Sequence, residues 1–163
     1  MHSITPYSRL ALNCVIGFFI SFLALTIGAQ TMSTSEPPIE KKVLEANTDF
    51  YTAFRTRNSE MMAGLWACDS DVSVIHPGWP ELEGRDAVLQ SWARIMNNEN
   101  SPEIYPENAL VHIQDHQVMV YCEEVLGSGR LDAVNIFVLE NGEWKMLHHR
   151  AIQPNVDSKM FPT

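Results

Sequence analysis

Basic side chains are scarce in this 163-residue sequence, which holds 11 Lys and Arg against 20 Asp and Glu. With neutral histidines, the formal net charge at pH 7 is −9. A nucleic-acid-binding surface needs clustered Lys and Arg to contact phosphates, and the sequence has no such cluster. The composition therefore argues against a nucleic-acid partner.

Motifs for metal, nucleotide and covalent chemistry are also missing. The sequence has no Cys-x-x-Cys pair, no glycine-rich phosphate loop and no Gly-x-Ser-x-Gly nucleophile elbow. His148 and His149 are adjacent, so on a strand they point to opposite faces and cannot share one ion. We therefore predict that the protein works without a metal ion and without a cofactor.

Charge is nearly absent from residues 1–35, where Arg9 is the only charged side chain. Residues 10–29 form an uncharged apolar run that ends in small residues, which is typical of a signal peptide. The run is also long enough to span a bilayer, so an uncleaved membrane anchor is the alternative. Either way we predict an exported domain, periplasmic, secreted or anchored outside the membrane. Residues 30–38 are expected to form a flexible linker and residues 155–163 a C-terminal tail.

Cysteine is also rare, with Cys14 in the apolar run and Cys68 and Cys122 in the rest of the chain. In an oxidising compartment, Cys68 and Cys122 could form a disulfide. Free cysteine is commonly buried, so two separate buried thiols are the alternative, and we favour it.

Hydrophobic periodicity divides the folded part, residues 39–154, into a helical half and a strand half. Apolar residues recur at helical spacing over three segments, residues 39–57, 60–67 and 85–97. Strand patterns cover residues 72–76, 109–114, 117–126, 131–139 and 144–152. The Asn141-Gly142 pair is a strong hairpin signal between the last two strands. This order predicts an α+β domain, in which three helices cover one face of a curved antiparallel sheet.

Four segments carry a resemblance to a known family. Residues 47–51 read NTDFY, residues 76–79 HPGW, residues 84–92 GRDAVLQSW and residues 133–149 AVNIFVLENGEWKMLHH. In order and spacing, they resemble the SnoaL-like branch of the nuclear transport factor 2-like (NTF2-like) superfamily. The resemblance spans residues 39–154 and implies a cone of curved sheet closed by three helices, a cystatin-like roll with an internal pocket. The resemblance does not determine the function, because the superfamily includes cyclases, isomerases, dehydratases and association modules.

The chain departs from this family at the end of the last strand. Relatives commonly follow the two histidines with a third histidine, a small residue and a serine, whereas this chain has Arg150, Ala151 and Ile152. Arginine stays charged at neutral pH and cannot act as a general base. A mechanism that depends on a third histidine is therefore not expected here.

Strand alternation sorts the side chains that could line the pocket. The face of the last strand with Trp144 and Met146 is the more apolar, so His148 and Arg150 are predicted to point inward and His149 outward. A β-bulge would reverse this assignment beyond its position. On the strand over residues 117–126, alternation does not decide between Glu123 and Glu124. The resemblance favours Glu124 as the inward carboxylate.

The candidate site follows from these assignments. A histidine beside a carboxylate can move a proton, and an arginine can clamp a substrate carboxylate or enolate. The alternative is structural, with buried tryptophans as core and a Glu124–Arg150 ion pair that does no chemistry. The predicted catalytic residues are His76, Glu124 and His148; the predicted ligand-binding residues are Tyr51, Trp79, Trp92, Asn135 and Arg150.

Two functions remain open from the sequence. The first is a small-molecule pocket protein, an acid–base enzyme of the isomerase, dehydratase or hydrolase type. The second is a non-catalytic ligand-binding or dimeric association module. We also predict a homodimer through the second face of the sheet, because that face is unusually apolar for contact with water. Cover by the C-terminal tail is the alternative; the face carries Ser73, Ile75, Val134, Ile136, Val138 and Leu147.

Overall fold

A computed structural model describes residues 37–127 and 129–154. The predicted signal peptide or anchor, most of the predicted linker and the C-terminal tail lie outside these residues. Within the described ranges, no helix combines the length and the apolar character needed to cross a membrane.

The three predicted helices are present: α1 (Ile39–Arg55), α2 (Ser59–Leu65) and α3 (Arg85–Met96). In α1, the buried residues Val43, Phe50 and Phe54 recur at helical spacing and form the stripe that packs on the sheet. Helix α2 begins where the Asn58 side chain accepts a hydrogen bond from the Met61 backbone N–H. The apolar periodicity therefore predicted all three helices to within about two residues at each end.

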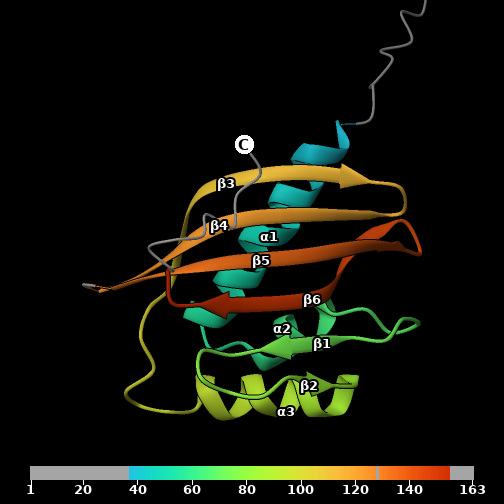
Figure 1. Ribbon diagram of the computed structural model, residues 1–163. Helices are drawn as coiled ribbons and strands as arrows, with labels where there is room; N and C mark the ends of the chain where they lie inside the picture. Colours follow the sequence, from blue (N-terminus) through green and yellow to red (C-terminus); the bar gives the residue numbers. More distant parts are fainter. Residues whose placement is uncertain (1–36, 128, 155–163) are drawn as a thin grey trace, which may run out of the picture. The chain divides into compact units, whose positions relative to one another are not determined.

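Six strands form one curved sheet in the order β2-β1-β6-β5-β4-β3. Figure 1 shows this sheet running from β3 to β2, with α1 lying across β3, β4 and β6. Neighbouring strands are antiparallel except β1 and β6, which are parallel. The strands are β1 (Ser73–Ile75), β2 (Leu82–Glu83), β3 (Tyr105–Gln114), β4 (Gln117–Leu126), β5 (Gly129–Glu140) and β6 (Glu143–Ile152).

The hairpin between β5 and β6 turns where the sequence predicts it. Asn141 and Gly142 have φ angles of 52° and 84°, the positive values that a tight two-residue hairpin turn requires. The predicted α+β fold is confirmed, but the short strand β2 and the parallel pairing of β1 with β6 were not predicted.

A β-bulge in β6 decides which side chains of that strand face the core. Ile136 of β5 pairs with His148, whereas the next residue, Phe137, pairs with Met146. Leu147 is therefore the extra residue, and the alternation of β6 changes phase there. As a result Met146, His149 and Ala151 are all buried.

The two cysteines in the described part of the chain are free, as the favoured alternative predicts. Cys122 is buried in the core on β4, whereas Cys68, which was expected to be buried, is exposed. A disulfide between them is therefore not present.

Candidate functional site

A small cavity of about 160 Å³ lies between the helices and the concave face of the sheet. Its walls are mostly apolar, and four polar side chains reach it from four different elements: Tyr51 from α1, His76 after β1, Glu124 from β4 and His149 from β6. The apolar walls are Phe50, Phe54, Pro77, Trp92, Ile95, Pro102, Ile104, Leu126, Leu131 and Ala151.

Strand register brings the polar groups together. Val120 of β4 pairs with Asn135 of β5, and Asn135 pairs with His149 of β6, so these residues share the inner face. Glu124 lies on the same face of β4 as Val120, and it is 2% exposed. Residues far apart in sequence therefore meet at one wall of the cavity.

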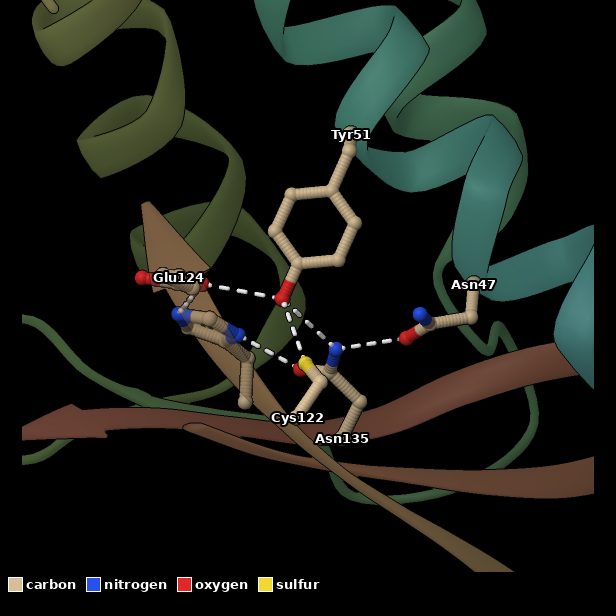
Figure 2. A network of polar contacts seen from close by, with 6 residues as sticks. Asn47, Tyr51, Cys122, Glu124 and Asn135 are labelled. Atoms are coloured by element: carbon tan, nitrogen blue, oxygen red, sulfur yellow. Dashed lines mark hydrogen bonds and ion pairs between the residues drawn. The ribbon is translucent and has the colours of Figure 1, made fainter. Parts of the chain in front are cut away.

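A hydrogen-bond network connects the buried polar groups (Figure 2). The Tyr51 hydroxyl donates to Glu124 Oε1 at 3.0 Å and lies 3.3 Å from the Cys122 thiol. Asn135 Nδ2 donates to Asn47 Oδ1 at 2.7 Å and to the Tyr51 oxygen at 3.1 Å. Asn47 and Tyr51 both extend from α1 toward the strands, so this helix holds the network in place.

The network determines the tautomer of His149. Its Nδ1 lies 2.6 Å from Asn135 Oδ1, and an amide oxygen only accepts hydrogen bonds, so Nδ1 carries the proton. In the neutral ring, Nε2 is then a bare acceptor, and it lies 3.8 Å from Glu124 Oε1. At 3.8 Å the two atoms are not hydrogen-bonded, but a proton on either group relieves the repulsion between two facing acceptors, so Glu124 and His149 form a pair that can hold one proton.

Burial sets the proton affinity of this pair. It raises the pKa of Glu124 from 4.5 to about 7, against a smaller lowering by the Tyr51 hydrogen bond. Burial also holds the pKa of His149 well below 6.5, with smaller contributions from His76 and His148. At neutral pH His149 is therefore uncharged and Glu124 is close to half protonated. This is the protonation state that suits a group acting both as acid and as base.

His76 contributes a second neutral imidazole to the cavity wall. The Ser91 hydroxyl donates its only proton to the Val88 carbonyl at 2.7 Å, so it accepts from His76 Nε2 at 2.8 Å. The neutral ring is therefore protonated on Nε2 and bare on Nδ1. Burial lowers the pKa of His76 to about 4, so the ring is uncharged at neutral pH.

The predicted inward positions of His148 and Arg150 are wrong, and so is the outward position of His149. The bulge at Leu147 moves His148 and Arg150 to the outer face, where Arg150 is exposed and His148 Nδ1 lies 2.7 Å from Ser73 Oγ. The proposed Glu124–Arg150 ion pair does not form, because the two side chains lie on opposite faces. His149 takes the inward place that the sequence assigned to His148.

The other predicted residues divide into two groups. Tyr51, His76, Trp92 and Glu124 line the cavity as expected. Trp79 is half-buried outside that lining, with its ring centroid 5.0 Å from that of His76 in an edge-to-face arrangement. Asn135 is fully buried, but it supports His149 and Tyr51 and does not line the cavity.

Sequence reasoning missed His149, and it missed the support that Ser91 gives His76. The consecutive apolar pair Met146-Leu147 was the available signal for His149, because two apolar neighbours in an alternating strand are compatible with a bulge. Nothing in the sequence signals the Ser91 contact, which depends on α3 packing beside β1.

Metal binding has no support within the described residues, which contain no group of three or more His, Cys, Asp and Glu side chains placed to hold an ion. The pair formed by His149 and Glu124 offers only two side chains as potential ligands.

Comparison with known proteins identifies the family. A model of the SnoaL-like domain matches residues 43–154. The F-box protein SKIP8 of Arabidopsis thaliana is 27% identical over 121 residues, which are 73% of this chain and 52% of that protein. The chain thus spans about half the length of this curated relative.

Solved structures of similar proteins share the fold. A candidate dehydratase of the NTF2-like family from Streptomyces avermitilis is 30% identical, with a TM-score of 0.66 over 71% of this chain and 96% of that one. A candidate calcium/calmodulin-dependent protein kinase type II association domain from Thiobacillus denitrificans is 26% identical, with a TM-score of 0.60 over 68% of this chain and 93% of that one. A cystatin-like protein of unknown function from Nostoc punctiforme is 13% identical, with a TM-score of 0.59 over 72% of this chain and 92% of that one, and it shows the fold alone.

Proposed function

Because the chain belongs to the SnoaL-like domain family, we propose that its cavity binds a small molecule and that Glu124 and His149 move a proton on it without a cofactor. The observation that carries this proposal is the buried pair itself, with Glu124 Oε1 and the bare His149 Nε2 3.8 Å apart at the wall of an apolar cavity. A carboxyl group with a pKa raised to about 7 can both take up and release a proton at neutral pH.

The reaction types that fit are dehydration and isomerisation. In a dehydration, the Glu124 carboxylate takes a proton from the carbon next to a carbonyl. The bond to the hydroxyl on the adjacent carbon then breaks, and the hydroxyl leaves with that proton as water. In an isomerisation, the same proton returns to a different carbon. The likeness to a candidate dehydratase at 30% identity favours the first reaction.

Deuterium exchange tests this proposal before the natural substrate is known. The protein is incubated in deuterium oxide with small enolisable ketones and six-membered β-hydroxy ketones, and proton NMR follows deuterium uptake and loss of water. We expect exchange or dehydration of at least one compound, and a rate about 100-fold or more lower for Glu124→Gln, because a positioned acid–base group contributes at least that much.

Glu123→Gln is the matched control for this experiment. Glu123 is the neighbouring residue on β4, but it lies on the outer face and pairs there with Arg130 at 2.6 Å. The control is expected to keep the wild-type rate. Equal rates for wild type and Glu124→Gln would contradict the proposed role of the pair, and binding without any exchange would favour the non-catalytic alternative.

A dimeric association module is the second candidate, and the apolar outer face of the sheet favours it. Met119, Tyr121, Val134 and Ile136 are all half-buried there, although the described helices cover only the inner face. Exposed apolar patches of this kind usually mark interfaces, and a two-fold symmetric pair is the common arrangement. The likeness to a candidate association domain at 26% identity agrees with this proposal.

Light scattering on the chain without residues 1–35 tests the dimer. We expect twice the chain mass at micromolar concentration, and a shift toward monomer for Ile136→Lys, which would bring two charges together across the two-fold axis. A monomer mass for the unsubstituted protein, unchanged after removal of residues 155–163, would contradict the dimer.

Export of the domain is also a proposal, and it rests on the uncharged run of residues 10–29.

A further inference from the structure

The polar side chains at the cavity wall, Tyr51, His76, Glu124 and His149, leave only acceptors free for a ligand, and the unpartnered indole N–H of Trp92 is itself buried. The hydroxyl proton of Tyr51 is directed to Glu124, the Nδ1 proton of His149 to Asn135 and the Nε2 proton of His76 to Ser91. Among the contacts of the described residues, no hydrogen bond occupies Glu124 Oε2, His149 Nε2 or His76 Nδ1. The one mobile donor among these four side chains is the proton that the pair of Glu124 and His149 can hold.

Positive charge is also missing from the cavity. Its lining, as far as the structure describes it, contains no Lys or Arg, and His76 and His149 are both uncharged at neutral pH. Arg150, which the sequence predicted as an anion clamp, lies exposed on the opposite face of the sheet. A carboxylate or phosphate would lose its hydration here without gaining a cationic partner, and it would meet the negative charge of Glu124.

The size of the cavity limits the ligand further. A volume of about 160 Å³ is close to that of an apolar cavity of ~150 Å³ that holds benzene in another protein. The aromatic walls, which include Phe50, Phe54 and Trp92, suit a ring or a compact branched hydrocarbon. The ligand therefore combines an apolar body of this size with very few polar atoms.

We propose that the ligand of this cavity is an uncharged, ring-sized hydroxyl compound, an alcohol or phenol whose O–H donates to the acceptors on Glu124, His149 or His76. The inference rests on the proposed function only in using the same cavity, and it specifies the polar group that a ligand carries; in the proposed dehydration this is the hydroxyl that leaves as water. A hydroxyl group supplies a hydrogen-bond donor to acceptors that have no donor in the protein. A ketone has only acceptors, so it depends on the single proton of the pair.

A matched series of ligands tests the proposal on the full-length protein. Cyclohexanol, cyclohexanone, cyclohexylammonium and benzoate have similar apolar bodies and differ in donor capacity and charge. Binding is measured at pH 7 by ligand-observed NMR and by thermal shift. We expect cyclohexanol to bind about tenfold more tightly than cyclohexanone, the difference made by one buried hydrogen bond, and benzoate not to bind measurably.

The Glu124→Gln variant tests whether the preference for alcohol over ketone can be reversed. The substitution replaces the free acceptor Oε2 with an N–H donor of nearly the same shape. In this variant the preference for cyclohexanol is expected to disappear or to change in favour of cyclohexanone, whereas Glu123→Gln keeps the wild-type preference. Tighter binding of cyclohexanone, cyclohexylammonium or benzoate than of cyclohexanol to the wild-type protein would overturn the inference, and so would binding of none of the four at millimolar concentration.

The two proposals fail separately in this design. If cyclohexanol is preferred but no compound undergoes proton exchange, the ligand class stands and the catalytic proposal falls. If proton exchange occurs but ketones bind better than alcohols, the catalytic proposal stands and the ligand class is wrong.

Discussion

Replacing Glu124 with Gln is expected to stabilise the protein at about pH 8 while it removes the proposed activity. Burial raises the pKa of Glu124 from 4.5 to about 7, and each pKa unit corresponds to ~1.4 kcal/mol. Above pH 7 the buried charge therefore costs the folded state about 3 kcal/mol. Glutamine has no charge, and its amide can still accept from Tyr51, so most of this cost should disappear in urea unfolding measurements.

The gain has a defined pH window. Glu124 has a folded-state pKa above its unfolded value, so its favourable contribution is present below about pH 4.5 and is lost as the pH rises to about 7. The difference in unfolding free energy between Glu124→Gln and wild type should follow that rise and then stay constant. His76, with its pKa lowered from 6.5 to about 4, has the opposite dependence: it loses stability as the pH falls through that range.

Glu123→Gln again separates the buried site from a general charge effect. Glu123 is part of a surface ion pair with Arg130, which is typically worth less than 1 kcal/mol. This variant should be unchanged or slightly less stable at every pH. Equal stability of Glu124→Gln and wild type at pH 8 would mean that the Glu124 carboxylate is solvated in the folded protein, and the account of the pair would fail.

Replacing Asn135 with Leu should cause the largest loss of stability among single substitutions at the site. Asn135 is 0% exposed and makes hydrogen bonds with Asn47, Tyr51 and His149. Leucine has a similar volume but leaves at least two buried groups, Asn47 Oδ1 and His149 Nδ1–H, without partners. Each such group costs about 1–3 kcal/mol, so we expect a loss of about 4 kcal/mol in urea unfolding.

Asn135→Asp keeps the test informative if the Leu variant does not fold. A carboxylate still accepts from His149 Nδ1–H, and its negative charge should raise the pKa of His149. Imidazole NMR titration should detect that rise, and the proton-exchange activity should show a changed pH profile. Val134→Thr, on the outer face of the same strand, is the control and should alter neither measurement. An unchanged His149 titration in Asn135→Asp would show that Asn135 does not hold this ring.

Local sequence signals were sufficient for most of the fold. Helical spacing in residues 39–57 and 85–97, strand alternation and the Asn141-Gly142 turn each depend on neighbours in sequence, and each predicted the observed element. The parallel pairing of β1 with β6 joins residues about 75 positions apart, as in Ser73 with His148, and no local pattern reports such a contact. The family resemblance implied the roll but not this register.

The site shows how one residue can reverse a prediction. Tyr51, His76, Glu124 and Trp92 were placed at the cavity correctly, but for Glu124 the family resemblance made the choice, because alternation alone did not decide between it and Glu123. Beyond Leu147 the bulge shifts β6 by one residue, and every later side chain changes face. The prediction thus placed His148 at the cavity in the position that His149 occupies. It also pointed Arg150 inward, whereas the backbone of β6 directs it to the outer face.

Titration of the Glu124 carboxyl group tests the central claim most directly. Glutamate labelled at the side-chain carboxyl carbon gives one NMR signal per residue, and the signal that disappears in Glu124→Gln identifies the one to follow. Burial of the Glu124 carboxyl group predicts a pKa, and so a midpoint of this signal, at about pH 7. A midpoint near the ordinary value of 4.5 would show that Glu124 is an ordinary ionised carboxylate at neutral pH, and it would contradict the proposed acid–base site.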